Sequence, residues 1–111
     1  MLKFIVVPQG CYAEINSSTS EEVLGLCTFG LYGCCPIIVT NLNSARMILC
    51  HADGYMVLPD SDGNTALDNA DYGIPAWIRR VCPDGDYHNL KIHVGENKGE
   101  ESSFLIKFKE V

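Results

Sequence analysis

The sequence has few basic residues and no long apolar segment. Its 111 residues include eight Lys and Arg against fourteen Asp and Glu, so the formal net charge is −6. Without a basic stripe to displace counterions, the chain is not expected to bind nucleic acid or an anionic membrane surface. No run approaches the roughly 20 apolar residues that span a bilayer, and the apolar start ends at Pro8, too early for a signal peptide. We therefore expect a soluble protein that is cytoplasmic or exported without a cleaved signal peptide, including export into a host cell.

Cysteine pairs of the C-x-x-C type are also missing, although the chain has six cysteines. The adjacent Cys34 and Cys35 would point to opposite faces of a strand, which suits neither a metal site nor a dithiol. A chain of this length can bury a hydrophobic core without disulfide bonds, and a free cysteine packs as a small hydrophobic residue. We expect free thiols, no metal and no cofactor; a disulfide-linked or redox protein is the alternative.

The hydrophobic pattern indicates one α+β domain over residues 1–111. Apolar and β-branched runs predict strands at residues 2–7, 11–15, 34–40, 45–51, 55–58, 89–94 and 103–108. Capping residues followed by carboxylates predict a short helix that ends near residue 26. Apolar residues at helical spacing around Trp77 predict a second helix over residues 71–81, with Pro75 in its first turn. The expected architecture is mainly β, with packed sheets as in a β-sandwich and one or two helices.

The two central apolar runs predict a β-hairpin that brings a thiol to an imidazole. A loop centred on Leu42 and Asn43 would place Cys34 opposite His51, with Cβ atoms about 4.5–5.5 Å apart. A cysteine beside a histidine can form a thiolate–imidazolium pair, which activates the sulfur near neutral pH. A three-residue loop would instead turn His51 toward Cys35, which is the fallback nucleophile. Cysteine and histidine in an apolar hairpin are also ordinary packing residues, so the pairing alone leaves both interpretations open.

The segment from Thr28 to Cys34 (Thr-Phe-Gly-Leu-Tyr-Gly-Cys) resembles the nucleophile motif of the CheD family of chemoreceptor glutamine deamidases, Thr-Leu-Gly-Leu-Gly-Ser-Cys. His51 follows Cys34 by seventeen positions, which is the family's spacing. The segment 48–54 is similar to the corresponding part of N-terminal asparagine amidohydrolases, and cytotoxic necrotizing factor toxins share the Cys–His arrangement. The resemblance covers residues 28–61, and Tyr32-Gly33 replaces the family's Gly-Ser.

The resemblance implies a single CheD-like amidohydrolase domain that acts as a protein-glutamine deamidase. Cys34 would attack the carboxamide and leave a thioester, and His51 would serve as its acid and base. Thr28 would orient His51 or the substrate amide. The implied partner is a protein that carries the target Gln, and the enzyme is expected to be a monomer.

Three neighbouring residues are expected to contact the substrate amide. Backbone N–H groups around Gly33 would stabilise the oxyanion of the tetrahedral intermediate. Tyr32 and Asp53 flank the proposed nucleophile and base in the sequence and are expected to contact the substrate or the oxyanion. Two alternatives remain open: an amidohydrolase of N-terminal Asn or of small amides, and a non-catalytic interaction module with the same fold.

Overall fold

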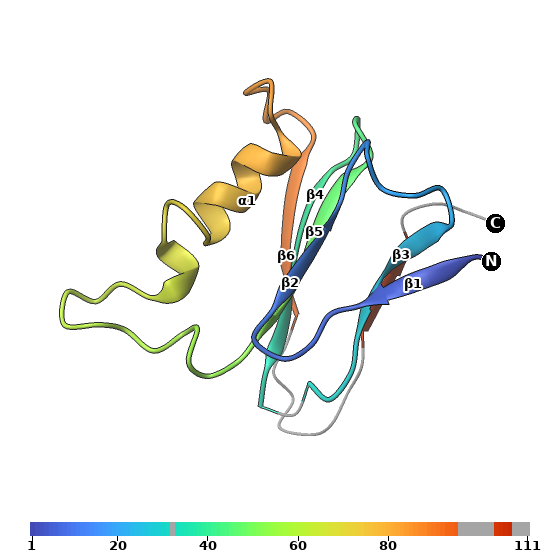
Figure 1. Ribbon diagram of the computed structural model, residues 1–111. Coiled ribbons are helices and arrows are strands. Elements are labelled where there is room, and N and C mark those ends of the chain that lie inside the picture. Colours follow the sequence, from blue (N-terminus) through green and yellow to red (C-terminus); the bar gives the residue numbers. More distant parts are fainter. Residues whose placement is uncertain (32, 96–103, 108–111) are drawn as a thin grey trace.

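The computed structural model describes residues 1–31, 33–95 and, as a strand, 104–107. Two β-sheets face each other, and a single α-helix covers the outer face of one of them (Figure 1). The predicted mainly β, α+β fold is therefore confirmed. The strands are β1 (Lys3–Val6), β2 (Tyr12–Ile15), β3 (Val23–Thr28), β4 (Cys35–Asn41), β5 (Arg46–Ala52), β6 (Leu90–Val94) and β7 (Phe104–Lys107). The helices are the 3₁₀ turn η1 (Ala66–Asp68) and α1 (Ile74–Val81).

The two sheets differ in size and in strand direction. The larger sheet has the order β2-β5-β4-β6 and is antiparallel throughout. The smaller sheet has the order β1-β3-β7, in which β1 runs parallel to β3 and β7 runs antiparallel to it. The chain leaves the smaller sheet after β1, adds β2 to the edge of the larger sheet, and returns as β3 (Figure 1). The segment between β1 and β2 thus crosses from one sheet to the other.

Alternating side chains of the central hairpin divide the core into two parts. Ile38 and Leu49 point between the sheets, where they pack with Ile15 and Leu26. Their sequence neighbours point to the helix side, where the buried set is Ile37, Val39, Ile48, Cys50, Ala52, Ala76, Trp77, Val81 and Cys82. Side chains of a strand alternate between its two faces, and consecutive residues of the hairpin are apolar and buried. Both hairpin strands are therefore apolar on both faces.

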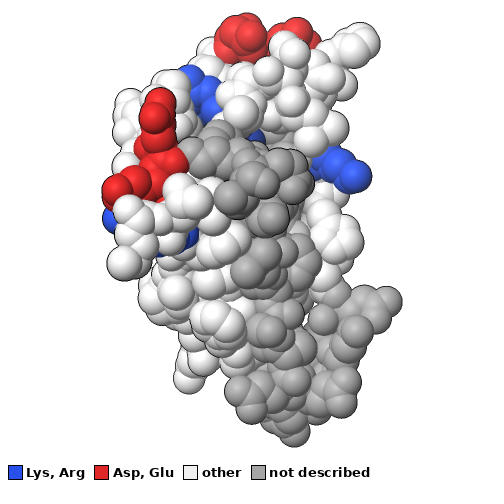
Figure 2. Space-filling model, turned by 90° about the vertical axis from the view of Figure 1, so that its right-hand side faces the viewer, with Lys and Arg blue, Asp and Glu red and all other residues white. Residues whose placement is uncertain are grey.

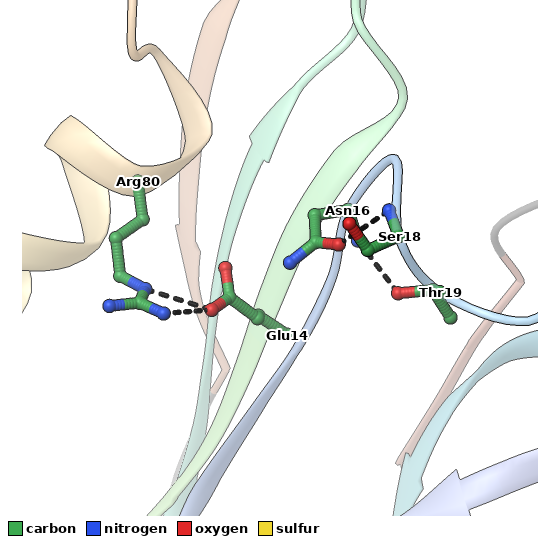
Figure 3. A network of polar contacts seen from close by, with 5 residues as sticks. All are labelled: Glu14, Asn16, Ser18, Thr19 and Arg80. Carbon is green, nitrogen blue, oxygen red and sulfur yellow. Dashed lines mark hydrogen bonds and ion pairs between the residues drawn. The ribbon is translucent and has the colours of Figure 1, made fainter.

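Helix α1 is held to the larger sheet by one aromatic anchor and one ion pair. Trp77 is fully buried, and its ring centroid lies 5.1 Å from that of Tyr12 on β2. Arg80 donates from Nε to Glu14 Oε1 at 2.8 Å and makes a second, shorter contact from its terminal nitrogen (Figure 3). Trp77 is thus the core residue that anchors α1.

The short helix expected near residue 26 does not form, because its residues make strand β3. The capping side chains before it close a turn: Thr19 Oγ1 accepts from the N–H of Asn16 at 2.9 Å, and Asn16 Oδ1 accepts from the N–H of Ser18 at 2.8 Å (Figure 3). Strand β3 pairs with strands on both sides and is almost fully buried. Pairing of β3 with β1 and β7 therefore outweighs the local preference of these residues for a helix.

The expected strand at residues 55–58 is also absent, and these residues form turns. Asp53 Oδ1 accepts from the N–H groups of Tyr55 and Met56 at 3.0 and 3.2 Å, which closes a turn directly after β5. The helix predicted over residues 71–81 begins later, at Ile74, and has Pro75 in its first turn as expected.

The surface on the side of the smaller sheet has scattered charges. Figure 2 shows acidic side chains at its margins, a few separate basic side chains, and mostly uncharged residues elsewhere among those drawn as described. No continuous basic patch lies on this face of the described structure. Within the described segments, no helix has the length and apolar character needed to cross a bilayer.

Candidate active site

Thr28 and His51 meet where the two sheets face each other. Thr28 ends β3 in the smaller sheet, and His51 lies near the end of β5 in the larger one. The Thr28 hydroxyl oxygen lies 2.7 Å from Nδ1 of His51, and both side chains are almost completely buried. The structure thus joins two of the three predicted catalytic residues.

The hydrogen bonds around Thr28 determine which nitrogen of His51 carries the proton. The Thr28 hydroxyl donates its only proton to the Val7 carbonyl at 2.7 Å. Its oxygen must therefore accept from His51, which places the proton of the neutral ring on Nδ1. Nε2 then has a free lone pair, and it is buried without a hydrogen-bond partner in the described part of the chain. His51 is arranged as a neutral base with one unused nitrogen.

The turn between β1 and β2 holds both residues through its backbone. Cys11 donates its N–H to the Pro8 carbonyl at 3.1 Å, with Gly10 at φ 75° in the third position, as a type II turn requires. Gly10 then donates to the His51 carbonyl at 2.9 Å, while His51 donates to the Cys11 carbonyl at 3.0 Å. Two residues of the turn thus oppose one residue of β5, which is a β-bulge with glycine in its first position. Val7, just before the turn, accepts the Thr28 proton.

The contact of this turn with His51 was not predicted from the sequence. The Pro8-Gln9-Gly10 sequence carries a turn signal, but it does not show that the turn lies against His51. Glycine suits this position because its φ is positive, and a Cβ atom would come within 2.9 Å of Asp53 Oδ2, so the Asp53 side chain would have to shift. Cys11, exposed and opposite His51, was likewise not among the expected site residues.

The predicted register of the hairpin is wrong by two residues. Pro36, not Cys34, lies opposite His51, and the loop comprises residues 42–45. Asn41 is the reason: it remains in β4, where its side chain donates to the Val81 carbonyl at 2.9 Å and accepts from the N–H of Asn43 at 3.0 Å. Ala45 closes this loop, which lies one residue later than expected, in the left-handed conformation, with φ 53°. Because side chains alternate with a period of two, a shift of two keeps the face of each residue.

Cys34 lies in the loop that enters β4, two residues before the position opposite His51. Gly30 and Gly33 both have positive φ, and the N–H of Cys34 is bonded to the Leu31 carbonyl at 3.3 Å. Only 6% of Cys34 is exposed. Its sulfur makes no hydrogen bond to His51 Nε2 in the structure, which leaves that nitrogen without a partner in the described residues. The catalytic contact between them stays a prediction.

The electrostatic environment keeps Cys34 and His51 neutral. Burial, and then the negative charges of Asp53 and Cys35, raise the pKa of the Cys34 thiol. Burial lowers the pKa of His51, while Asp53 acts in the opposite direction. Both shifts disfavour the thiolate–imidazolium pair expected from the sequence, so the resting site holds a thiol and a neutral imidazole. The proton would then move from sulfur to nitrogen during attack.

The residues expected to contact substrate take different positions. Gly33 is exposed in the loop before Cys34, and its neighbour's N–H is already used in the turn. Asp53 is half-buried, closes the turn after β5 and lies close to Gly10. Tyr32 lies outside the described residues.

Cys35 and Cys50 take no part in this arrangement. Cys50 is buried on the helix side of the larger sheet, and Cys35 packs against the same cluster, so both face away from His51 as expected. All six cysteines lie in the described part of the chain and are free thiols. The described residues contain no cluster of three or more side chains suited to hold a metal ion.

No protein-family model matches the chain, and no curated protein resembles it significantly. The function is therefore inferred from the geometry of the site. A buried histidine with a fixed proton and a free nitrogen is equipped to accept a proton from a nearby thiol. The loop with Cys34 enters the neighbouring strand beside it, so thiol-based nucleophilic chemistry is what this arrangement favours.

Proposed function

We propose that the protein is a cysteine-dependent amidohydrolase that converts a Gln side chain of a partner protein into Glu. The observation that carries the proposal is the buried Thr28–His51 hydrogen bond, which leaves Nε2 of His51 unprotonated and without a hydrogen-bond partner among the described residues. A structural histidine buried this deeply normally uses both nitrogens. Nε2 of His51 has no hydrogen-bond partner among the described residues and lies beside the loop that carries Cys34. This is consistent with a base that contacts the Cys34 thiol only during the reaction.

The reaction follows from this arrangement in two steps. Nε2 of His51 accepts the Cys34 thiol proton while the sulfur attacks the carboxamide carbon, and the same proton then passes to the departing ammonia. The thioester left on Cys34 is attacked by a water molecule, which gives its proton to His51. The carboxylic acid is released, and the proton returns to the Cys34 sulfur. Thr28 accepts from the Nδ1 proton of His51 throughout, so that only Nε2 gains and loses a proton.

The resemblance of residues 28–61 to glutamine deamidases favours Gln as the target. The same site would serve a cytoplasmic enzyme or one exported into a host cell, acting as a monomer in either place. The alternative reactions, on an N-terminal Asn or on a small amide, use the same nucleophile and differ only in the substrate.

A mixture of synthetic amides tests the proposal. It contains peptides with an internal Gln, peptides with an N-terminal Asn, and free glutamine, and mass spectrometry follows conversion of each amide into its acid. We expect conversion of internal Gln by the wild type and by Cys35→Ser, which alters a thiol facing away from His51. Conversion of N-terminal Asn alone would support the alternative substrate, and no conversion of any amide would contradict amidohydrolase activity.

A further inference from the structure

A second candidate site is an open cleft of about 570 Å³ in the segment that follows β5. Residues 53–72 leave the sheet and run alongside helix α1, apart from the smaller sheet (Figure 1). Its lining includes Tyr55, Leu58, Asp60, Thr65, Asp68 and Tyr72. None of these residues belongs to the Thr28–His51 site, so the cleft is considered separately from that site.

The walls of the cleft combine exposed aromatic rings with carboxylates. Tyr55 is 83% exposed and Tyr72 is 56% exposed, so both rings are accessible to a ligand in the cleft. Leu58 adds a third exposed apolar side chain. Aromatic rings next to carboxylates attract ammonium and guanidinium groups through cation–π and ionic contacts.

The two carboxylates in the wall are held in place and keep one oxygen available. Asp60 Oδ1 accepts from the N–H groups of Asp62 and Asn64 at 2.9 and 3.0 Å. Asp68 Oδ2 accepts from the N–H and hydroxyl of Thr65 at 2.9 and 3.1 Å. Neither Asp60 Oδ2 nor Asp68 Oδ1 has a hydrogen bond within the described structure. Each carboxylate is therefore oriented by its loop and can still accept from a ligand.

The negative charge of residues 53–72 favours a positively charged ligand. Residues 53–72 contain five aspartates and no lysine or arginine. The nearest basic group of helix α1, Arg79, donates to the Ala70 carbonyl and does not line the cleft. The described residues do not assemble three metal-ligating side chains here, which favours an organic cation over a metal ion.

We propose that this cleft docks a basic side chain, Lys or Arg, of the substrate polypeptide near its target Gln. The inference rests on the proposed function. Tyr55 follows His51 by four residues, so the chain between their Cα atoms spans at most about 14 Å. An extended substrate covers that distance in about four residues. A residue docked against Tyr55 therefore lies within about four positions of the Gln that reaches Cys34.

Binding and turnover are measured separately with one pair of peptides. Both carry a central Gln, and the residues about four positions on either side are Lys in one peptide and Glu in the other. Fluorescence anisotropy gives the Kd of each peptide for full-length Cys34→Ser, and mass spectrometry follows conversion of Gln by the wild type. We expect the Lys peptide to bind more tightly, with an advantage that falls as salt is raised.

Neutral variants of the wall test the assignment. The double change Asp60→Asn and Asp68→Asn keeps an oxygen acceptor for each loop, and we expect it to weaken binding of the Lys peptide about three- to tenfold. Asp84→Asn is the matched control, because Asp84 also accepts from a backbone N–H, at 3.0 Å, but lies outside the cleft. Its Kd should not change.

The outcomes separate this inference from the proposed function. Equal binding of both peptides, or equal loss of binding in Asp84→Asn and in the double variant, would overturn the docking site even if Gln is converted. Selective, Asp60- and Asp68-dependent binding without conversion would support docking and contradict the deamidase activity.

Discussion

The hydroxyl of Thr28 connects the two sheets through its hydrogen bond to His51 and also donates to the Val7 carbonyl, and both bonds are buried. Thr28→Val keeps the shape of the side chain but leaves a buried carbonyl and a buried ring N–H without partners. We expect the free energy of unfolding to fall by about 1–3 kcal/mol and amide hydrolysis to decrease. Denaturant titration and ammonia release measure the two effects.

Thr28→Ser is the control for that change, because it keeps the hydroxyl and loses only a methyl group. It should retain most of the activity. If Thr28→Val hydrolyses amides as fast as Thr28→Ser, the hydrogen bond to His51 does not prepare the base.

Asp53 influences both proposed catalytic groups through its negative charge, which raises the pKa of Cys34 and of His51. Asp53→Asn removes the charge and keeps an oxygen for the N–H groups of Tyr55 and Met56. The thiolate of Cys34 should then form at lower pH, so its alkylation by iodoacetamide should be faster at any pH below its pKa.

The alkylation rate of Cys34 as a function of pH measures this shift. In the wild type the rate should keep rising with pH above 9.0, the ordinary thiol value, because the pKa is raised. A profile in Asp53→Asn that stays unchanged or moves to higher pH would contradict the effect of the Asp53 charge on the thiol. Exposed Cys11 provides an internal reference, since its alkylation should not change between the two proteins.

At the scale of single elements, the turn at residues 8–11 positions His51. Gly10→Ala places a Cβ atom 2.9 Å from Asp53 Oδ2 and puts alanine at a positive φ. Gly85→Ala is a close control, because Gly85 has φ 76° and no atom within 4 Å of an added Cβ. Each change should cost about 1–2 kcal/mol for the strained backbone, and Gly10→Ala should cost more.

Only Gly10→Ala should also reduce amide hydrolysis, since only this turn contacts His51. Thermal denaturation and ammonia release compare the two variants. Equal activity of the two proteins would show that the geometry of the turn does not control the base.

The sequence predicted most elements because their apolar patterns are strong. The hairpin, helix α1 and strand β6 all have runs whose period is clear. Strand β3 was predicted as a helix because its pairing partners, β1 and β7, lie far away in the sequence. The same limit applies to the turn at Gly10, whose contact with Asp53 depends on tertiary structure.

The candidate site was predicted in part. Thr28 and His51 were named from the sequence, and the structure brings them together. The register of Cys34 was wrong because it depended on a loop whose left-handed residue, Ala45, has no sequence signal. The directions of the two pKa shifts disfavour the expected thiolate–imidazolium pair, because burial, which the spacing of two residues does not reveal, favours both neutral forms.

At the scale of the whole molecule, the protein is stabilised by two apolar layers and has no covalent cross-links among its cysteines. We therefore expect the melting temperature to be the same with and without a reducing agent. A lower melting temperature after reduction would reveal a disulfide and favour the alternative of a redox protein. Calorimetry with and without a phosphine reductant makes the comparison.

The central claim is that Cys34 is the nucleophile of an amidohydrolase. The most direct measurement is ammonia release from a Gln peptide by wild type, Cys34→Ser and Cys11→Ser, each shown to be folded by its thermal melt. Because a serine hydroxyl attacks a carboxamide far more slowly, Cys34→Ser should be inactive. Cys11→Ser, which changes the exposed thiol opposite His51, should keep its activity. A folded Cys34→Ser protein that still releases ammonia, or an inactive Cys11→Ser protein, would contradict the account.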